Sequence, residues 1–243
     1  MTVVVVGASS GLGRTLAGEL ARRGHGLLLV ASDLRDLHAV AADLQVRHDI
    51  TVSTLALDLA GEPDPGARIR AALVGLPALS ALLLPVGVSR GDDDFSLSAA
   101  RIGELLAINL HAPLAIVHAL LPDLRDSRGS VVLFGSIASA RGRGRNVVYA
   151  SAKRALDCLY ESLRQTHAPD ALHVQLYRLG FLATNLTYGM KLPLAASQPA
   201  DIARVVVARL GKGSFAHHLP RQYGLIAWLM RRLPWSLYRR WRG

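Results

Sequence analysis

The chain has 243 residues, which suits one α/β domain, and 51% of them are hydrophobic, so a disordered chain is excluded. The formal net charge is +10, and no acidic residue follows Asp201. Charge alone does not decide between nucleic acid, an anionic membrane and an anionic substrate as partners. The single cysteine, Cys158, cannot form an internal disulfide, and residues 1–7 lack a secretory signal pattern, so we expect a cytoplasmic protein.

Short apolar runs rich in valine and leucine alternate along the chain with stretches of helical periodicity. The runs expected to form buried strands are Thr2–Val6, Gly26–Ala31, Val52–Leu57, Leu79–Val86, Ser130–Phe134, His173–Leu179 and Ser214–Leu219. The helices expected between them are Leu12–Arg23, Leu34–Arg47, Pro65–Leu73, Leu97–Leu121, Val147–His167 and Pro199–Leu210.

This alternation implies parallel strands joined by right-handed helical crossovers, because both faces of such a sheet must be covered. The predicted fold is α/β: a single doubly wound Rossmann domain over residues 1–220, with about seven parallel strands and helices on both faces. A C-terminal amphipathic helical tail at residues 221–243 follows, and it is not an independent domain. A (β/α)8 barrel would need an eighth unit, which the C-terminal segment does not supply.

A glycine-rich turn directly follows the first expected strand. It opens a helix, so backbone N–H groups and the positive helix end would face the same point, which suits a pyrophosphate. The spacing is Gly-x-x-x-Gly-x-Gly rather than the commoner Gly-x-Gly-x-x-Gly, and a turn that only reverses the chain is the alternative. The residues expected to contact a dinucleotide here are Gly7, Ser9, Ser10, Gly11, Leu12, Gly13 and Arg14.

The residues after the second strand bear on the choice of cofactor. An acid at the end of this strand would bind the ribose 2′-OH and repel a 2′-phosphate, but Ser32 stands there, one residue before Asp33. Arg14 and Arg35 lie nearby, and arginine can clamp a phosphate, although either could be a solvated helix residue. NADP(H) is therefore favoured, and Asp33 keeps NAD(H) open. Further expected cofactor contacts are Ser32, Asp58 and Leu59, with Asp58 alternatively a cap.

Ser136 closes the fifth strand, and thirteen residues later Tyr149 starts a helix, with Lys153 one turn on. Residues four apart share a helix face, so the phenol and the ammonium would point into the same cleft. Reduction of a ketone needs a proton donor as hydride arrives, and a nearby ammonium lowers the pKa of a phenol. The pattern predicts that Lys153 makes Tyr149 a usable acid.

With the glycine turn, Asn109 within Ile-Asn-Leu, Ser136 and the Tyr149–Lys153 segment, the chain resembles the short-chain dehydrogenase/reductase family over about residues 2–220. The resemblance implies that Tyr149 is the general acid/base, Ser136 orients the carbonyl and Lys153 also holds the nicotinamide ribose. It implies that Asn109 keeps a water in the proton relay. The alternative is a strand-end cap at Ser136 and ordinary helix-surface residues at Tyr149 and Lys153.

The chain departs from the family's usual pattern in places. Val6 stands where the family usually has Thr, Leu84–Gly87 replaces Asn-Asn-Ala-Gly, and Leu179-Gly180 replaces Pro-Gly. The resemblance places Thr184 against the nicotinamide amide. The remaining expected cofactor contacts are Gly87 and Gly180, besides Tyr149, Lys153 and Thr184.

Three arginines, Arg141, Arg143 and Arg145, lie on the glycine-containing loop between Ser136 and Tyr149. Three cations beside the catalytic pair could receive a phosphate on the substrate. A solvated loop and a nucleic-acid-binding stretch are the alternatives.

The tail at residues 224–243 contains all three tryptophans and five arginines. Aromatic rings interleaved with arginines suit an anionic membrane surface, whereas the charges and Pro234 argue against a span. Packing across a dimer or onto the domain is the alternative. Nucleic acid is not expected as a partner, because no recognisable binding module accompanies the charge.

The tail, with Arg178, Thr184 and Gly189-Met190, also resembles the keto-reductase subunits of the decaprenylphosphoryl-ribose 2′-epimerase type, whose substrate is a polyprenyl-phosphate sugar. The expected function is reduction of a ketone on an amphiphilic, lipid-linked or phosphorylated molecule by an enzyme peripheral to the inner face of the membrane. The alternatives are a small-molecule ketoreductase whose tail builds the oligomer and a non-catalytic NADP sensor. The long helices favour a homodimer or homotetramer, and no metal is assigned a role.

Overall fold

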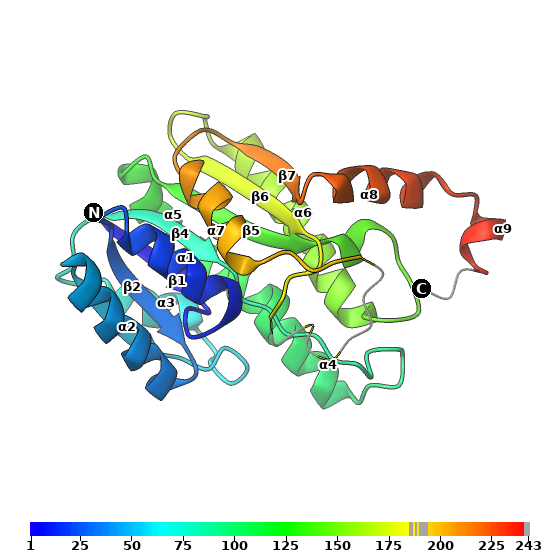
Figure 1. The fold of residues 1–243 in the computed structure, drawn as a ribbon, viewed down its shortest axis with the longest axis horizontal. Coiled ribbons are helices and arrows are strands. Elements are labelled where there is room, and N and C mark those ends of the chain that lie inside the picture. The colour runs from blue at the N-terminus through cyan, green and yellow to red at the C-terminus, as the bar shows by residue number, and fades with distance from the viewer. Residues whose placement is uncertain (185–186, 188, 190–193, 241–243) are drawn as a thin grey trace.

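The computed structural model describes the whole chain except residues 185–186, 188, 190–193 and 241–243. Its described part forms a parallel seven-stranded sheet with the order β3-β2-β1-β4-β5-β6-β7 (Figure 1). This confirms the predicted fold class. The strands are β1 (Thr2–Val6), β2 (Gly26–Ala31), β3 (Val52–Ala56), β4 (Leu79–Leu84), β5 (Ser130–Ser136), β6 (His173–Leu179) and β7 (Phe215–Leu219).

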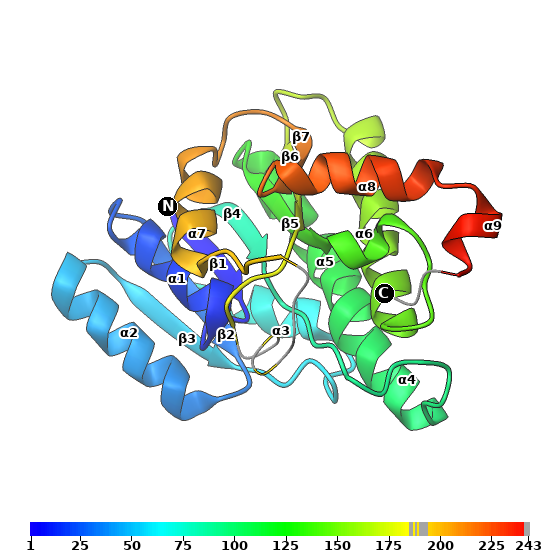
Figure 2. The same ribbon diagram turned by 45° about the vertical axis from the view of Figure 1, so that its right-hand side comes forward.

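Helices cover both faces of the sheet, as Figures 1 and 2 show. On one face pack α1 (Gly11–Ala21), α2 (Leu34–His48) and α7 (Pro199–Ala208). On the other face pack α3 (Pro65–Ala72), α5 (Ala112–Asp126) and α6 (Val147–Thr166). The four valines of β1 are at most 1% exposed, because alternate side chains enter the two apolar layers.

The chain reverses its direction across the sheet between β1 and β4. From β1 it moves outward to β2 and β3, then returns to the other side of β1 and continues through β4, β5, β6 and β7. Loops that leave neighbouring strands in opposite directions open a crevice at the carboxyl edge. The fold therefore brings the glycine turn after β1 close to the ends of β4 and β5.

The helix expected over Leu97–Leu121 differs from the structure in its bounds and its winding. It begins as α4 (Ala99–Leu106), passes through a π-helical turn (Ala107–His111) and continues as α5 to Asp126. The prediction ended the helix before Pro122, but the ring of Pro122 is exposed and Leu124 beyond it is fully buried. Burial of Leu124 favours continuation of the helix despite the missing N–H group.

The continuous segment Ala99–Asp126 has a mean hydropathy of 1.7 in its most apolar window and is long enough to cross a membrane. Core helices of soluble proteins meet the same criterion, and α5 packs against β4, β5 and α3 here. Length and composition of this segment therefore carry little weight as an indication of a membrane span.

The predicted helical tail forms α8 (Gln222–Arg232) and the short α9 (Trp235–Tyr238). In both ribbon views α8 leaves the edge of the sheet beyond β7, and α9 forms the far tip of the molecule (Figures 1 and 2). Tyr223, Ala227 and Tyr238 are buried against the domain, whereas Trp228 and Trp235 are exposed. The tail thus packs on the body along one side and presents apolar rings on the other.

Candidate active site

A cavity of about 410 Å³ opens at the carboxyl edge of the sheet. It extends from the glycine turn after β1 to the ends of β5 and β6. Of the residues predicted as a site, those lining it are Gly7, Ser9, Ser10, Gly11, Leu12, Gly13, Ser32, Asp58, Leu59, Gly87, Ser136, Arg143, Tyr149, Lys153, Gly180 and Thr184. Arg14, Asn109, Arg141 and Arg145 do not line it. The fold therefore brings together most of the predicted cofactor and catalytic residues.

The glycine turn approaches its own helix more closely than any side chain would allow. Gly7 and Gly11 have φ angles of +89° and +51°, in the region that favours glycine. A Cβ atom on Gly13 would lie 1.9 Å from the carbonyl oxygen of Gly7. Ser10 precedes α1 without a side-chain cap, so the first N–H groups of this helix stay available to a ligand at its positive end. The turn therefore fits a dinucleotide pyrophosphate.

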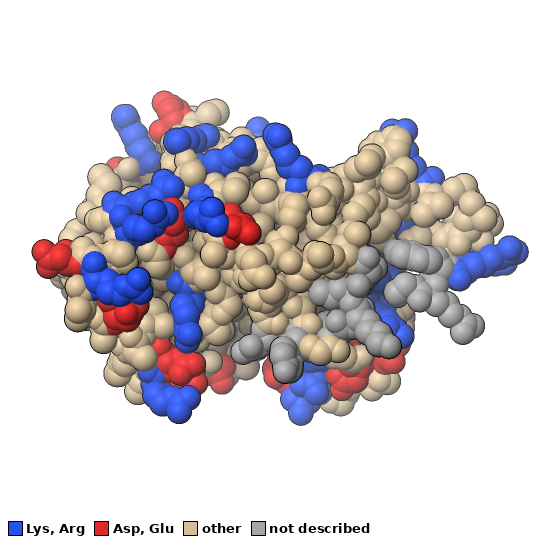
Figure 3. All heavy atoms as spheres, viewed as in Figure 1, with Lys and Arg blue, Asp and Glu red and all other residues tan. Residues whose placement is uncertain are grey.

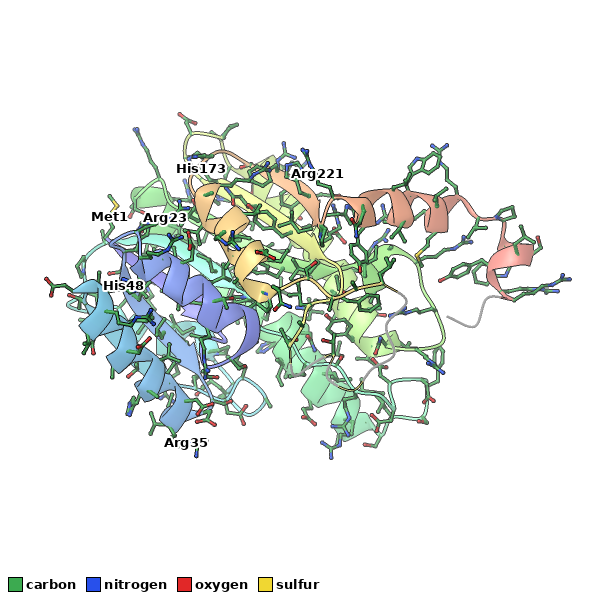
Figure 4. The ribbon with its side chains drawn as sticks, in the orientation of Figure 1. Met1, Arg23, Arg35, His48, His173 and Arg221 are labelled. Carbon is green, nitrogen blue, oxygen red and sulfur yellow. The ribbon has the colours of Figure 1, made fainter. Side chains whose placement is uncertain are left out.

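The residues around the expected 2′-phosphate position favour NADP(H). Asp33 uses its carboxylate to cap α2, accepting a hydrogen bond from the Asp36 N–H at 2.9 Å, and only Ser32 lines the cavity. Arg14 donates to the carbonyl of Ser9 and lies 3.7 Å from an Asp36 oxygen, so its guanidinium stays beside the turn. Arg35 is 90% exposed and points into solvent at the end of α2 (Figure 4), which confirms the solvated alternative for Arg35.

Asp58 follows β3 and lines the cavity, and its side chain also caps the turn that follows it. Its carboxylate accepts a hydrogen bond from the Ala60 N–H at 3.1 Å, so the capping alternative is realised alongside the cavity position. Leu59 beside it is buried in the core.

Ser136 ends β5 and Tyr149 lies in the first turn of α6, so the two hydroxyls meet at the cavity. Burial raises the pKa of the Tyr149 phenol, and a hydrogen bond with Ser136 and the nearby positive charge of Arg143 oppose this rise. Arg143 is thus one cation that eases ionisation of Tyr149, and the same effect of Lys153 stays a prediction. The hydroxyl of Ser136 also accepts the Ala138 N–H at 3.1 Å, as a strand-end cap would.

Lys153 lies one turn after Tyr149, but its side chain reaches the loop after β4. Its Nζ atom is 5.9 Å from the centroid of the Tyr149 ring and donates to the carbonyl of Val86 at 2.9 Å. Burial lowers the pKa of Lys153 to about 8. Both side chains are buried rather than on the helix surface, so the alternative of ordinary surface residues is wrong.

Asn109 lies in the π-helical turn and is fully buried. Its amide donates to the carbonyls of Val88 and Leu105 at 2.8 and 2.9 Å, and its oxygen accepts the Val88 N–H at 3.2 Å. Asn109 therefore holds the loop after β4 and stands behind the cavity wall. A Cβ atom on Gly87 would lie 3.0 Å from Lys153 Nζ and 3.1 Å from the Asn109 oxygen, so glycine permits this close arrangement.

Sequence reasoning missed Asp93, whose carboxylate caps the catalytic helix. It accepts the N–H groups of Val148 and Tyr149 at 2.9 and 3.0 Å, and its carbonyl accepts the Val147 N–H. Asp93 is 1% exposed, whereas Asp92 and Asp94 beside it are exposed. Nothing in the Asp92-Asp93-Asp94 run distinguishes the middle carboxylate, so only the fold identifies it.

The three loop arginines have three different environments. Arg141 donates to the carbonyls of Met230 and Leu233 at 2.7 and 2.6 Å, and its guanidinium lies 4.0 Å from the centroid of the Tyr238 ring. It therefore ties the loop to the tail and does not face the cavity. Arg145 is exposed. Arg143 alone of the three lines the cavity.

The described part of the loop after β6 lines the cavity and contacts both the glycine turn and the tail. A Cβ atom on Gly11 would lie 3.3 Å from the Thr184 methyl group. A Cβ atom on Gly180 would lie 2.1 Å from the Tyr223 ring of α8, so glycine is needed where the tail meets the site. Sequence reasoning did not anticipate Phe181 and Asn146, which also line the cavity. Gly189 is described, whereas Met190 lies outside the described residues.

Known proteins resemble this chain over most of its length. It is 26% identical over 212 residues to a very-long-chain 3-oxoacyl-CoA reductase of Coprinopsis cinerea, covering 86% of this chain and only 62% of that relative. It is 30% identical over 213 residues to an uncharacterized oxidoreductase of Myxococcus xanthus, covering 87% of this chain and 83% of the relative.

Solved structures share the fold. The short-chain dehydrogenase of Sphingobium yanoikuyae, in complex with NADPH, superposes with a TM-score of 0.82 at 24% identity and covers 97% of each chain. L-Sorbose reductase of Gluconobacter frateurii, complexed with NADPH and L-sorbose, gives a TM-score of 0.78 at 19% identity, covering 89% of this chain and 94% of that one. The family model described as short chain dehydrogenase matches residues 1–192. The chain therefore belongs to the short-chain dehydrogenase family of oxidoreductases, as its motifs predicted.

Proposed function

We propose that the protein is an NADP(H)-dependent carbonyl reductase. The observation that carries this proposal is that Ser136, Tyr149 and Lys153 share one cavity with a glycine turn in which a Cβ atom on Gly13 would clash with the backbone. The turn and the free N–H groups of α1 suit the pyrophosphate, and bound NADPH would supply the hydride for the carbonyl carbon. The structural relatives named above were solved with NADPH, which supports the choice of cofactor.

The buried hydroxyls at the end of β5 and the start of α6 suit a carbonyl oxygen. In this proposal Tyr149 gives its proton to that oxygen, and Ser136 orients the carbonyl by donating a hydrogen bond. Burial keeps the phenol protonated at neutral pH, so an acid is ready for the reductive direction. In this proposal the Lys153 ammonium binds the ribose of the cofactor. Asn109 holds the loop around Gly87 in place.

The choice of NADP(H) over NAD(H) depends on Arg14 and Asp33. The carboxylate of Asp33 caps α2 and does not line the cavity, so it is not placed to bind the ribose hydroxyls as an acid at the strand end would be. Arg14 lies beside the turn with an exposed guanidinium that can form charge-assisted hydrogen bonds with that phosphate.

The substrate in this proposal is a ketone on an amphiphilic or lipid-linked molecule. Exposed apolar side chains line the outer side of the tail, and arginines flank them. In Figure 3 the surface over α8 and α9 carries blue at its edges and no red. This composition suits an anionic bilayer, so the enzyme would be peripheral to the membrane and take its substrate there. The relatives named for very-long-chain 3-oxoacyl-CoA fit a large apolar substrate.

Replacement of Tyr149 by Phe tests the reductase. We expect Tyr149→Phe to bind NADPH as the unchanged protein does and to lose at least about a thousandfold in turnover, because the proton donor is absent. The assay follows NADPH absorbance over a panel of soluble and lipid-linked ketones. A variant that turns over at the original rate would refute the mechanism, and NADPH binding without turnover of any ketone would indicate a sensor.

Vesicle binding tests the membrane location. The tail also holds Arg141, so deleting it would disturb the loop, and point substitutions are preferable. We expect Trp228→Glu with Leu229→Glu to weaken binding to anionic phosphatidylglycerol vesicles at least about tenfold, because each exposed apolar side chain contributes on burial. Val46→Glu, at an exposed apolar position on α2 outside the tail, is the control. No binding by the unchanged protein would favour a small-molecule reductase whose tail builds a homodimer or homotetramer.

A further inference from the structure

The catalytic cavity contains a cation that nothing in the described part of the chain neutralises. Arg143 is partly buried, and its Nε atom is fully buried with no hydrogen-bond partner among the residues described. The groups that act on its charge are the Tyr238 and Tyr149 phenols and the cation of Arg145, with no carboxylate among them.

Such an environment is unfavourable for a guanidinium. Arginine stays protonated in proteins, so it cannot escape the cost of burial by losing its proton. Burial and the neighbouring cation of Arg145 lower the pKa of Arg143 without neutralising it. A buried N–H group without an acceptor also loses the hydrogen bond it made with water. Among the residues that the structure describes, no negative group with oxygen acceptors therefore pairs with Arg143.

The loop holds Arg143 in place from both sides. Before it, Arg141 donates to two tail carbonyls, and the Tyr238 hydroxyl donates to the Gly142 carbonyl at 2.8 Å. After it, Asn146 adopts a left-handed conformation and leads into α6. The anchored loop keeps the Arg143 side chain at the cavity wall, so this side chain does not need to be drawn in from solvent to meet a ligand.

An anion bound at Arg143 would lie in a different place from the phosphates of the cofactor. The pyrophosphate cradle lies after β1, whereas Arg143 acts on Tyr149 of α6, beside Ser136 at the end of β5, and β4 lies between β1 and β5. Arg14 stands beside the glycine turn and is available to the 2′-phosphate. An anion at Arg143 would therefore adjoin the reacting carbonyl.

We propose that Arg143 binds an anionic oxygen group, a phosphate or a carboxylate, on the carbonyl substrate and so selects anionic ketones over neutral ones. This inference rests on the proposed reductase function and narrows its substrate class. Arg143 is the one arginine of its loop with the position for this role, since Arg141 serves the tail and Arg145 is exposed.

Matched pairs of ketones test the proposal. Each pair has the same carbon skeleton and differs only in a phosphate monoester against its free alcohol, or a carboxylate against its methyl ester. We expect the unchanged protein to prefer the anionic member in kcat/KM by about 10- to 100-fold, as a charge-assisted hydrogen bond allows. Arg143→Met should lose this preference, Arg143→Lys should keep part of it, and Arg145→Met should retain it.

A second readout does not need turnover. In the presence of saturating NADPH, inorganic phosphate should raise the Tm of the unchanged protein and of Arg145→Met, and should not raise that of Arg143→Met. Arg143→Met should also unfold without ligand at a Tm equal to or above that of the unchanged protein, because an unpaired buried cation is removed. A lower Tm with an intact substrate preference would assign Arg143 a structural role and overturn the proposal.

The source of the anion is decided by a further comparison. A soluble phosphorylated ketone and the same ketone linked through phosphate to a lipid chain in vesicles are assayed side by side, and preference for either identifies its source. Equal kcat/KM for anionic and neutral ketones, unaffected by Arg143→Met, would refute the anion site while leaving the reductase function in place. Absence of all ketone reduction, with phosphate stabilisation that depends on Arg143, would refute the reductase function alone.

Discussion

Replacement of Gly13 by Ala tests how closely the cofactor turn is packed against its helix. The added Cβ atom would lie 1.9 Å from the Gly7 carbonyl oxygen and 2.7 Å from its carbon, whereas real Cβ contacts stay beyond 3.0 Å. Both neighbours are backbone atoms, so α1 would have to move by about 1 Å as a unit, and overpacking of this kind costs about 1–3 kcal/mol or more. For a domain of this size, about 3 kcal/mol lowers the Tm by about 6–12 °C.

Gly18→Ala in the same helix is the matched control. Nothing lies within 4 Å of a Cβ atom there, and a helix-interior alanine is more stable than glycine by about 0.5–1 kcal/mol. Thermal unfolding should therefore show opposite shifts for the two variants, and NADPH titration should show binding weakened at least about tenfold by Gly13→Ala alone. An unchanged Tm and an unchanged Kd for NADPH in Gly13→Ala would refute the steric reasoning.

Three other substitutions address the rest of the site. Asp93→Ala leaves two N–H groups of α6 unpaired, so kcat should fall about 10- to 100-fold while the KM for NADPH changes less than about twofold, and a normal kcat would contradict the capping role. Arg14→Ala should raise the KM for NADPH about tenfold with little effect on NADH, as steady-state assays with both cofactors would reveal. Because burial lowers the pKa of Lys153 to about 8 from its ordinary 10.5, the unfolded chain holds more protons between these values. Stability should therefore rise with pH across this window, and denaturant unfolding of Lys153→Met should lack that rise.

The sheet was predictable because its strands are uninterrupted apolar runs. The bounds predicted for β1, β2 and β6 match the structure, since each run ends in a turn signal. The end of β4 was placed two residues late, at Val86. Pro85 has no N–H group for the ladder, and the carbonyl of Val86 accepts a hydrogen bond from Lys153 instead.

The site was predictable where its residues are neighbours in sequence and less so where they meet only through the fold. The glycine turn and the pair Tyr149 and Lys153 are local patterns, and the cavity contains them. The direction of the Lys153 side chain depends on the loop after β4, which is distant in sequence. The separation of Arg141 from Arg143 likewise depends on a tail that lies about ninety residues further along the chain.

The contacts between the tail and the arginine loop constrain how this enzyme can be altered. Arg141 bonds to the carbonyls of Met230 and Leu233, and Arg231 bonds back to the carbonyl of Ala140. The acceptors are main-chain groups, so substitutions that preserve the backbone path and the two arginines leave the connection intact. If the loop alone were exchanged with that of a relative, the hydrogen bonds from Arg141 to the tail would be lost. Chimaeras that retain a formed cavity must therefore transfer the loop and α8 together.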